Sequence, residues 1–91
     1  GHYWAEAQVE GRRVKFMVDT GATTVALTEA DARRLGLEPR ELTFDQPVAT
    51  AGGRVMAAAV TLDYVSVAGA RVEDVEALVV REGLGTSLLG M

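Results

Sequence analysis

The sequence predicts a small all-β protein, a β-barrel or a β-sandwich, with one short helix. Apolar and polar residues alternate over several short stretches, with the period of two that half-buried strands require. Turn-forming glycines separate these stretches, and one stretch alone has helical spacing. The 91 residues suffice for one domain, residues 1–91, whose core is thin enough that a partner would help to stabilise it.

The first two predicted strands form a hairpin. Apolar residues alternate with polar ones from 3 to 10, Gly11-Arg12 supplies turn chemistry, and the alternation resumes from 14 to 18. The second strand therefore leads directly into Asp19. Trp4 fits either the core or an interface, and the core is the simpler assignment.

One helix is predicted at residues 28–35. Thr28 is a hydroxyl N-cap with an acid, Asp31, three positions on, and apolar residues follow at helical spacing. Gly36 stands where a left-handed C-cap belongs. These start and stop signals agree with one another, so the helix is short.

Prolines and glycines organise the rest of the chain. Pro39 and Pro47 argue against uninterrupted strand pairing, and adjacent glycines suit a hairpin tip because both tolerate positive φ. The remaining predicted elements are, in order, a loop with one edge strand at 37–45, a hairpin around Ala51-Gly52-Gly53, a long strand at 54–67, a turn at Ala68-Gly69-Ala70, a strand at 72–79, a glycine-containing loop at 82–85 and the closing segment Leu88-Leu89-Gly90-Met91.

Composition excludes several classes of function. The net charge is -4 and the nine basic residues are scattered, which argues against nucleic acid as a partner. The chain has no cysteine, so disulfides, a thiolate nucleophile and a cysteine-ligated zinc site are excluded. His2 is the single histidine, so a Ser-His pair would rest on the extreme N-terminus. Gly1-His2 is interpreted as a remnant of tag removal, and the sequence is expected to be part of a longer protein.

The segment with the clearest chemical potential surrounds Asp19. Apolar residues 16–18 precede it, and Thr20-Gly21-Ala22 follows, with a glycine that lets backbone approach closely. A carboxylate at the end of a buried strand can act as a general base for water if burial or a second acid tunes its pKa. It can equally close an Asx-turn, which is common at strand ends. The residues alone leave both interpretations open.

Four landmarks in this order resemble the retropepsin-like aspartic proteases, in particular their bacterial single-domain members. The landmarks are Asp-Thr-Gly-Ala at 19–22, the Ala-Arg-Arg-Leu-Gly-Leu segment at 32–37, Thr50-Ala51-Gly52-Gly53 and Leu88-Leu89-Gly90-Met91. Together they cover nearly the whole chain. The resemblance implies a closed β-barrel of the acid-protease type with one short helix.

The resemblance also implies roles for individual residues. Asp19 would be the catalytic acid, Thr20 would brace the active-site loop across a dimer axis, Gly21 would let substrate and water approach, and Ala22 would complete the loop. Ala51, Gly52 and Gly53 would form a flap over the substrate, although on sequence alone a plain β-turn fits as well. Leu88, Leu89 and Gly90 would pack beneath the active-site loop.

The expected partners follow from the same resemblance. No second Asp-Thr/Ser-Gly occurs, and Asp31, Asp45, Asp63 and Asp74 are more simply caps or surface acids, so a working site demands a homodimer. An extended peptide is the expected substrate, with no metal or cofactor. In the family the Leu-Leu-Gly element is followed by further chain, so the C-terminal end is expected to be truncated. Bacterial relatives imply a periplasmic protein with a membrane tether outside this sequence.

Two other functions fit parts of the sequence. Asp19-Thr20-Gly21-Ala22-Thr23 also fits the phosphate loop of kinase-like and actin-like ATP-binding domains, but a nucleotide cleft between two α/β halves needs a much longer chain. A non-catalytic dimerisation or peptide-binding module on the same fold is the second alternative, because fold alone does not establish activity. The intact Asp-Thr-Gly favours the protease.

Overall fold

Strands dominate the fold, as the alternating pattern predicts. The computed structural model describes residues 3–19, 24–50, 53–81 and 84–90. Within them the elements are, in chain order, β1 (Tyr3–Val9), β2 (Arg12–Asp19), β3 (Val25–Thr28), α1 (Glu29–Arg34), the 3-10 helix η1 (Pro39–Glu41), β4 (Phe44–Thr50), β5 (Gly53–Val67), β6 (Ala70–Val80) and β7 (Leu88–Gly90).

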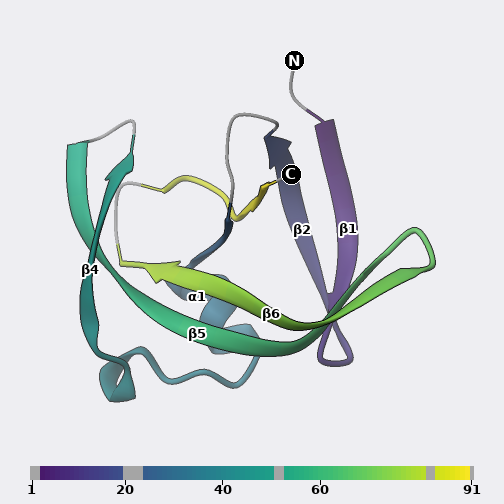
Figure 1. Cartoon of the computed structure of the whole chain (residues 1–91), viewed down its shortest axis with the longest axis horizontal. Helices are drawn as coiled ribbons and strands as arrows, with labels where there is room; N and C mark the ends of the chain where they lie inside the picture. Colours follow the sequence, from purple (N-terminus) through teal and green to yellow (C-terminus); the bar gives the residue numbers. More distant parts are fainter. Residues whose placement is uncertain (1–2, 20–23, 51–52, 82–83, 91) are drawn as a thin grey trace.

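Six of these strands close into a barrel, which confirms the predicted fold class. The strands follow the order β1-β2-β7-β3-β6-β5, and a second pairing between β1 and β5 closes the ring. That closure joins Ala7–Val9 to Val65–Val67 in antiparallel register. β4 pairs along the other half of β5, so the long strand β5 curves around the molecule and carries β4 on its outer part (Figure 1).

One of the turns differs slightly from the prediction for a physical reason. The β1–β2 turn is centred on Glu10 and Gly11, with φ of 51° and 83°, and not on Gly11-Arg12. The β5–β6 turn repeats this geometry at Ala68 and Gly69, with φ of 51° and 84°. Two positive φ values are what a two-residue hairpin turn requires to match the strand twist, so each glycine takes the second central position.

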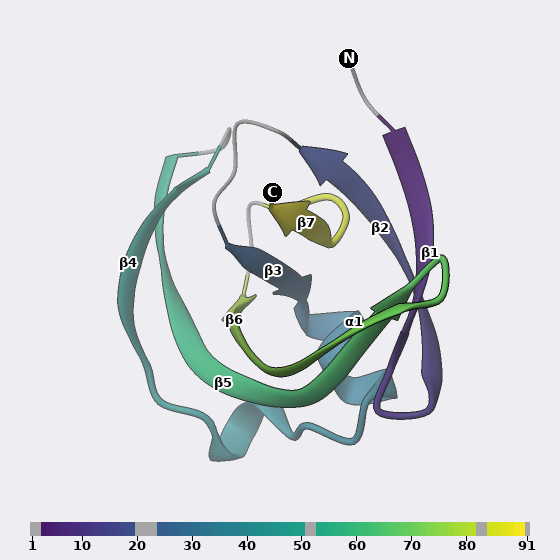
Figure 2. The same ribbon diagram turned by 45° about the vertical axis from the view of Figure 1, so that its right-hand side comes forward.

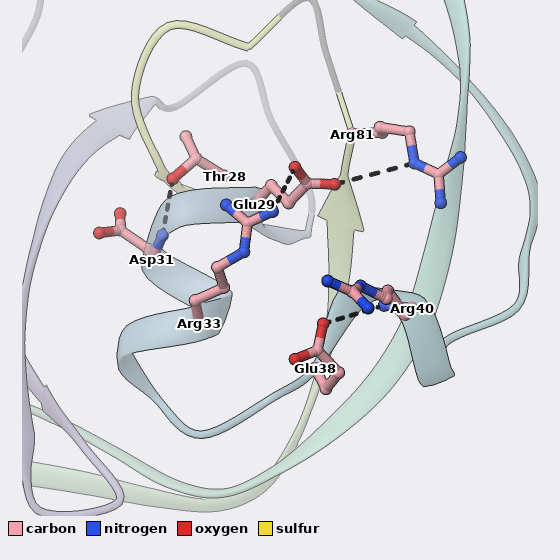
Figure 3. Close-up of polar contacts among 7 residues, drawn as sticks. All are labelled: Thr28, Glu29, Asp31, Arg33, Glu38, Arg40 and Arg81. Atoms are coloured by element: carbon pink, nitrogen blue, oxygen red, sulfur yellow. Dashed lines mark hydrogen bonds and ion pairs between the residues drawn. The ribbon is translucent and has the colours of Figure 1, made fainter.

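The helix has the predicted caps. Thr28 is the N-cap, and its Oγ1 accepts a hydrogen bond from the backbone N–H of Asp31 at 3.1 Å (Figure 3). Gly36 follows the C-cap Leu35 with φ of 85°. Glu29 in the first turn contacts two arginines, Arg33 at 3.2 Å and Arg81 at 3.8 Å. No helix among the described residues is both long and apolar enough to span a lipid bilayer.

The segment expected as a loop with one edge strand is more ordered than predicted. It contains the 3-10 helix η1, and β4 begins at Phe44 and continues through Pro47. Proline is tolerated there because β4 lies at the edge of the described sheet, with β5 as its neighbour. The register shifts between Phe44 and Gln46, so the pairing is interrupted just before the proline.

The barrel interior holds one apolar core. The largest fully buried side chains are Phe16, Leu27, Leu62, Val9, Val14, Val79 and Ser87. Trp4 is not among the buried residues: its side chain is 55% exposed, and the Nζ of Lys15 lies 4.6 Å from its ring centroid. The core assignment for Trp4 is therefore wrong. Its place in the alternation puts it on the same outer face as Glu6, which is also exposed.

Candidate active site

Asp19 lies at the end of strand β2, at one end of the barrel. The inward residues of β2, Val14 and Phe16, are fully buried, and this anchors the strand in the core. Its antiparallel partner β1 runs beside it from Val9 opposite Arg12 to Tyr3 opposite Val18. Asp19 is the last residue of β2, so its backbone is placed by a strand that is buried on its inner face.

The short strand β7 holds the other side of β2. Met17–Asp19 pair in parallel register with Leu88–Gly90, and Asp19 stands opposite Gly90. Leu88 also pairs with Ala26 of β3, so β7 lies between β2 and β3, as Figure 2 shows. The N–H of Met17 donates to the carbonyl of Ser87 at 2.9 Å. Backbone bonds therefore fix the end of β2 from both sides.

An apolar hollow lies beside the strand that carries Asp19. Its volume is about 510 Å³, and Val18, Leu89 and Gly90 form the wall next to the end of β2. The rest of the wall comes from Val25 on β3 and from apolar residues of β5 and β6. The carboxyl end of β2 is thus bordered by hydrocarbon on this side, and not by charged groups.

A second hollow of about 400 Å³ begins just after the Asp19 loop. Thr24, the first described residue beyond that loop, lines it together with Gln46 of β4, Thr61 of β5 and Glu76 of β6. Thr61 and Glu76 are register partners on adjacent strands, so the polar side chains share one face of the sheet. This surface offers both hydrogen-bonding groups and apolar area.

Comparison with known proteins places this fold in a family. The family described as "gag-polyprotein putative aspartyl protease" matches residues 5–91 of the chain. The chain belongs to the retropepsin-like aspartic protease family. The match includes β7 and all of β2, with Asp19 at its end, so the predicted resemblance is confirmed.

Individual relatives support the same membership. A retropepsin-like aspartic protease from Rickettsia conorii superposes with a TM-score of 0.90 at 40% identity, over 100% of this chain and 75% of that one. The EIAV protease, solved with the inhibitor HBY-793, superposes with a TM-score of 0.79 over 99% of this chain and 82% of that one; at 20% identity it supports the fold alone. An uncharacterized Sinorhizobium protein from the cobV 5' region is 42% identical over the whole chain. The chain spans about 40% of that protein's length.

The predicted retropepsin site residues fall partly outside the described part of the chain. The residues outside it are Thr20, Gly21 and Ala22 of the predicted active-site loop and Ala51 and Gly52 of the predicted flap. Among the remaining predicted residues, Gly53 begins β5 with φ of 116° and pairs with Thr50. The ends of β4 and β5 that flank the predicted flap lie at the same end of the molecule as the end of β2 (Figures 1 and 2).

The predicted support element is placed next to Asp19. Leu89 packs against the core, and Leu88 and Gly90 pair with the two ends of the Met17–Asp19 segment. This arrangement is compatible with the role expected for Leu88, Leu89 and Gly90, which stays a prediction. No group of three or more His, Cys, Asp or Glu side chains in the described segments is arranged to hold a metal ion.

Sequence reasoning missed one residue near the site, Ser87. Its side chain is fully buried, although serine is usually exposed. Its hydroxyl accepts from the N–H of Thr28 at 3.1 Å and donates to Oδ2 of Asp31. The Thr28-x-x-Asp31 pattern was a visible signal for the helix cap, but nothing local pointed to a partner near the other end of the chain.

Proposed function

We propose that the protein is an aspartic endopeptidase whose active site is assembled from two copies, each contributing Asp19. Family membership supports peptide-bond hydrolysis, and the chain has one Asp-Thr-Gly, which provides half of such a site. The observation that carries the proposal is the position of Asp19 at the end of β2, a strand that lies between β1 and β7, where Asp19 pairs with Gly90 and the Thr20-Gly21-Ala22 sequence begins.

Two carboxylates explain the chemistry without a covalent intermediate. When two carboxyl groups lie about 3 Å apart they cannot both ionise, so they share one proton; aspartic proteases are the standard example of this effect. The ionised Asp19 accepts a proton from a water molecule, whose oxygen attacks the peptide carbonyl carbon. The protonated Asp19 of the other copy donates its proton to the carbonyl oxygen. Collapse of the tetrahedral intermediate then breaks the C–N bond: the amine nitrogen takes the proton that the first Asp19 accepted from water, and a hydroxyl of the intermediate gives its proton to the second Asp19 as the carboxylic acid product forms.

An extended peptide is the substrate that suits this surface. The hollow beside Thr24 runs across β4, β5 and β6, and its wall combines apolar area with polar groups such as Gln46 and Glu76. A peptide in strand conformation can hydrogen-bond through its backbone while its side chains alternate into pockets. The β4–β5 hairpin, which carries the predicted flap residues Ala51, Gly52 and Gly53, would close over such a peptide and exclude water.

The direct test compares Asp19→Asn with a matched control, Asp63→Asn. Asp63 is an exposed acid on β5, outside both hollows, so its replacement removes the same charge without touching the proposed site. Cleavage of a mixed peptide library, followed by mass spectrometry, is measured for both variants and for the wild type. Circular dichroism verifies that each variant is folded.

Each result has a defined meaning. The proposal predicts that Asp19→Asn loses cleavage by at least about 100-fold, the usual contribution of a general acid–base group, while Asp63→Asn cleaves normally. Full activity in Asp19→Asn would refute the Asp19 mechanism. Peptide binding without cleavage in the wild type would favour the non-catalytic dimerisation or peptide-binding module.

A further inference from the structure

Ser87 is the one fully buried polar side chain among the described residues. It stands directly before β7, the strand that pairs with the end of β2. A buried hydroxyl loses its hydration, so it is stable only when protein groups replace the lost hydrogen bonds. The partners of Ser87 therefore report which parts of the structure it holds together.

The Ser87 hydroxyl is inserted into the cap of helix α1. In a capping box, the acid at the third helical position accepts directly from the N–H of the N-cap residue. Thr28 and Asp31 occupy these two positions. Here the N–H of Thr28 donates to Ser87 Oγ at 3.1 Å, and Ser87 Oγ donates to Asp31 Oδ2. The return bond of the box thus runs through a residue 56 positions beyond Asp31.

The same residue continues the connection to the strand that carries Asp19. The carbonyl of Ser87 accepts from the N–H of Met17 at 2.9 Å, and the next three residues pair with Met17–Asp19. The other carboxylate oxygen of Asp31 lies 3.6 Å from a guanidinium nitrogen of Arg34, and this ion pair also restrains the Asp31 side chain. Helix α1, β7 and the end of β2 are therefore joined through one serine.

We propose that Ser87 is a positioning residue for Asp19: its side chain, bound between Thr28 and Asp31, fixes the position of β7 and thereby the position of the end of β2. The inference rests on the proposed function, because positioning matters only if Asp19 reacts. Loss of the hydroxyl leaves the Thr28 N–H and the Asp31 carboxylate without their shared partner. β7 can then shift relative to α1, and a displacement of about 1 Å at a reacting group can lower the rate on the order of 100-fold.

The test is steady-state kinetics on a cleaved peptide, with active sites counted by titration with a tight-binding peptide-like inhibitor. Ser87→Ala removes the hydroxyl, and Asp31→Asn keeps an amide oxygen that can accept from Ser87. The matched control is Ser66→Ala, a half-buried serine on β5 that pairs with Gln8 of β1 at the barrel closure. Counting active sites separates slow catalysis from a smaller folded fraction, which is all that a purely structural role would produce.

The expected result is a fall in kcat per active site of roughly 10- to 100-fold for Ser87→Ala, with KM changed by less than about threefold. Asp31→Asn is expected to retain most of the activity, and Ser66→Ala all of it. If Ser87→Ala does not fold, Asp31→Ala removes the same bond from the other side and is expected to show the same fall in kcat.

The outcomes that overturn each claim differ. The inference is overturned if Ser87→Ala, or Asp31→Ala where that variant replaces it, has the wild-type kcat per active site. The proposed function survives that result as long as cleavage still depends on Asp19. A wild type that cleaves no peptide, or an Asp19→Asn variant with full activity, overturns the proposed function and the positioning role with it.

Discussion

Asp19 and Gly90 are backbone partners in the parallel pair of β2 and β7, although they stand near opposite ends of the chain. β7 has only three residues and lies between β2 and β3, so its position depends on a few contacts on each side. Because β2 ends at Asp19, any shift of β7 is transmitted to that residue. Changes in the β7 anchors are therefore expected to alter catalysis as well as stability.

Cleavage is expected to have a bell-shaped pH dependence with its maximum on the acid side of neutrality. The Asp19 pair must hold one proton: raising the pH removes it and leaves no acid, while lowering the pH adds a second and leaves no base. The measurement is kcat/KM for one peptide from acid to alkaline pH, with a statine-type inhibitor tested at each pH. Activity that keeps rising into the alkaline range would contradict the shared proton.

Phe16→Ala is expected to destabilise the fold by about 3–5 kcal/mol, because it removes a fully buried aromatic side chain and leaves a cavity. Urea unfolding followed by circular dichroism measures the change. Gln8→Ala, at an exposed position on the neighbouring strand, serves as the control and should change stability by less than about 0.5 kcal/mol. Similar midpoints for the two variants would show that Phe16 is not a core residue.

Ala68→Asn is expected to stabilise the protein, by roughly 0.5–1 kcal/mol. Ala68 has a φ of 51°, a left-handed conformation that alanine adopts at a cost and that asparagine tolerates better. The change also creates the Asn-Gly pair that two-residue hairpins favour. Thermal unfolding should show a higher Tm for Ala68→Asn and no increase for Ala59→Asn, which places asparagine inside β5. A lower Tm for Ala68→Asn would contradict the turn geometry.

Local patterns predicted most of the elements because their causes are local. The alternation around Phe16 requires one buried face, and the strand follows it. Thr28, Asp31 and Gly36 specify where the helix begins and ends through their own hydrogen bonds and φ preferences. The β1–β2 turn was misplaced by one residue because glycine can occupy either central position, and the chain places Glu10 at the first.

Local patterns do not predict contacts between segments that are far apart in the sequence. Leu88–Gly90 carries no local signal that it should lie between β2 and β3, and its place near Asp19 came only from the family resemblance. The partnership of Ser87 with Thr28 and Asp31 joins segments that are far apart in sequence, so no spacing could indicate it. The residue type of Trp4 favours the core, but its position in the alternation indicates the outer face, and the side chain is exposed.

Subunit mixing tests most directly whether two copies share one site. Wild-type and Asp19→Asn chains are mixed in varied proportions at constant total concentration, allowed to exchange, and assayed for peptide cleavage. If each site needs an Asp19 from both subunits, activity falls as the square of the wild-type fraction, so an equal mixture retains about a quarter of the wild-type activity. Activity that falls in direct proportion, with about half remaining in that mixture, would contradict a site made from two Asp19 residues.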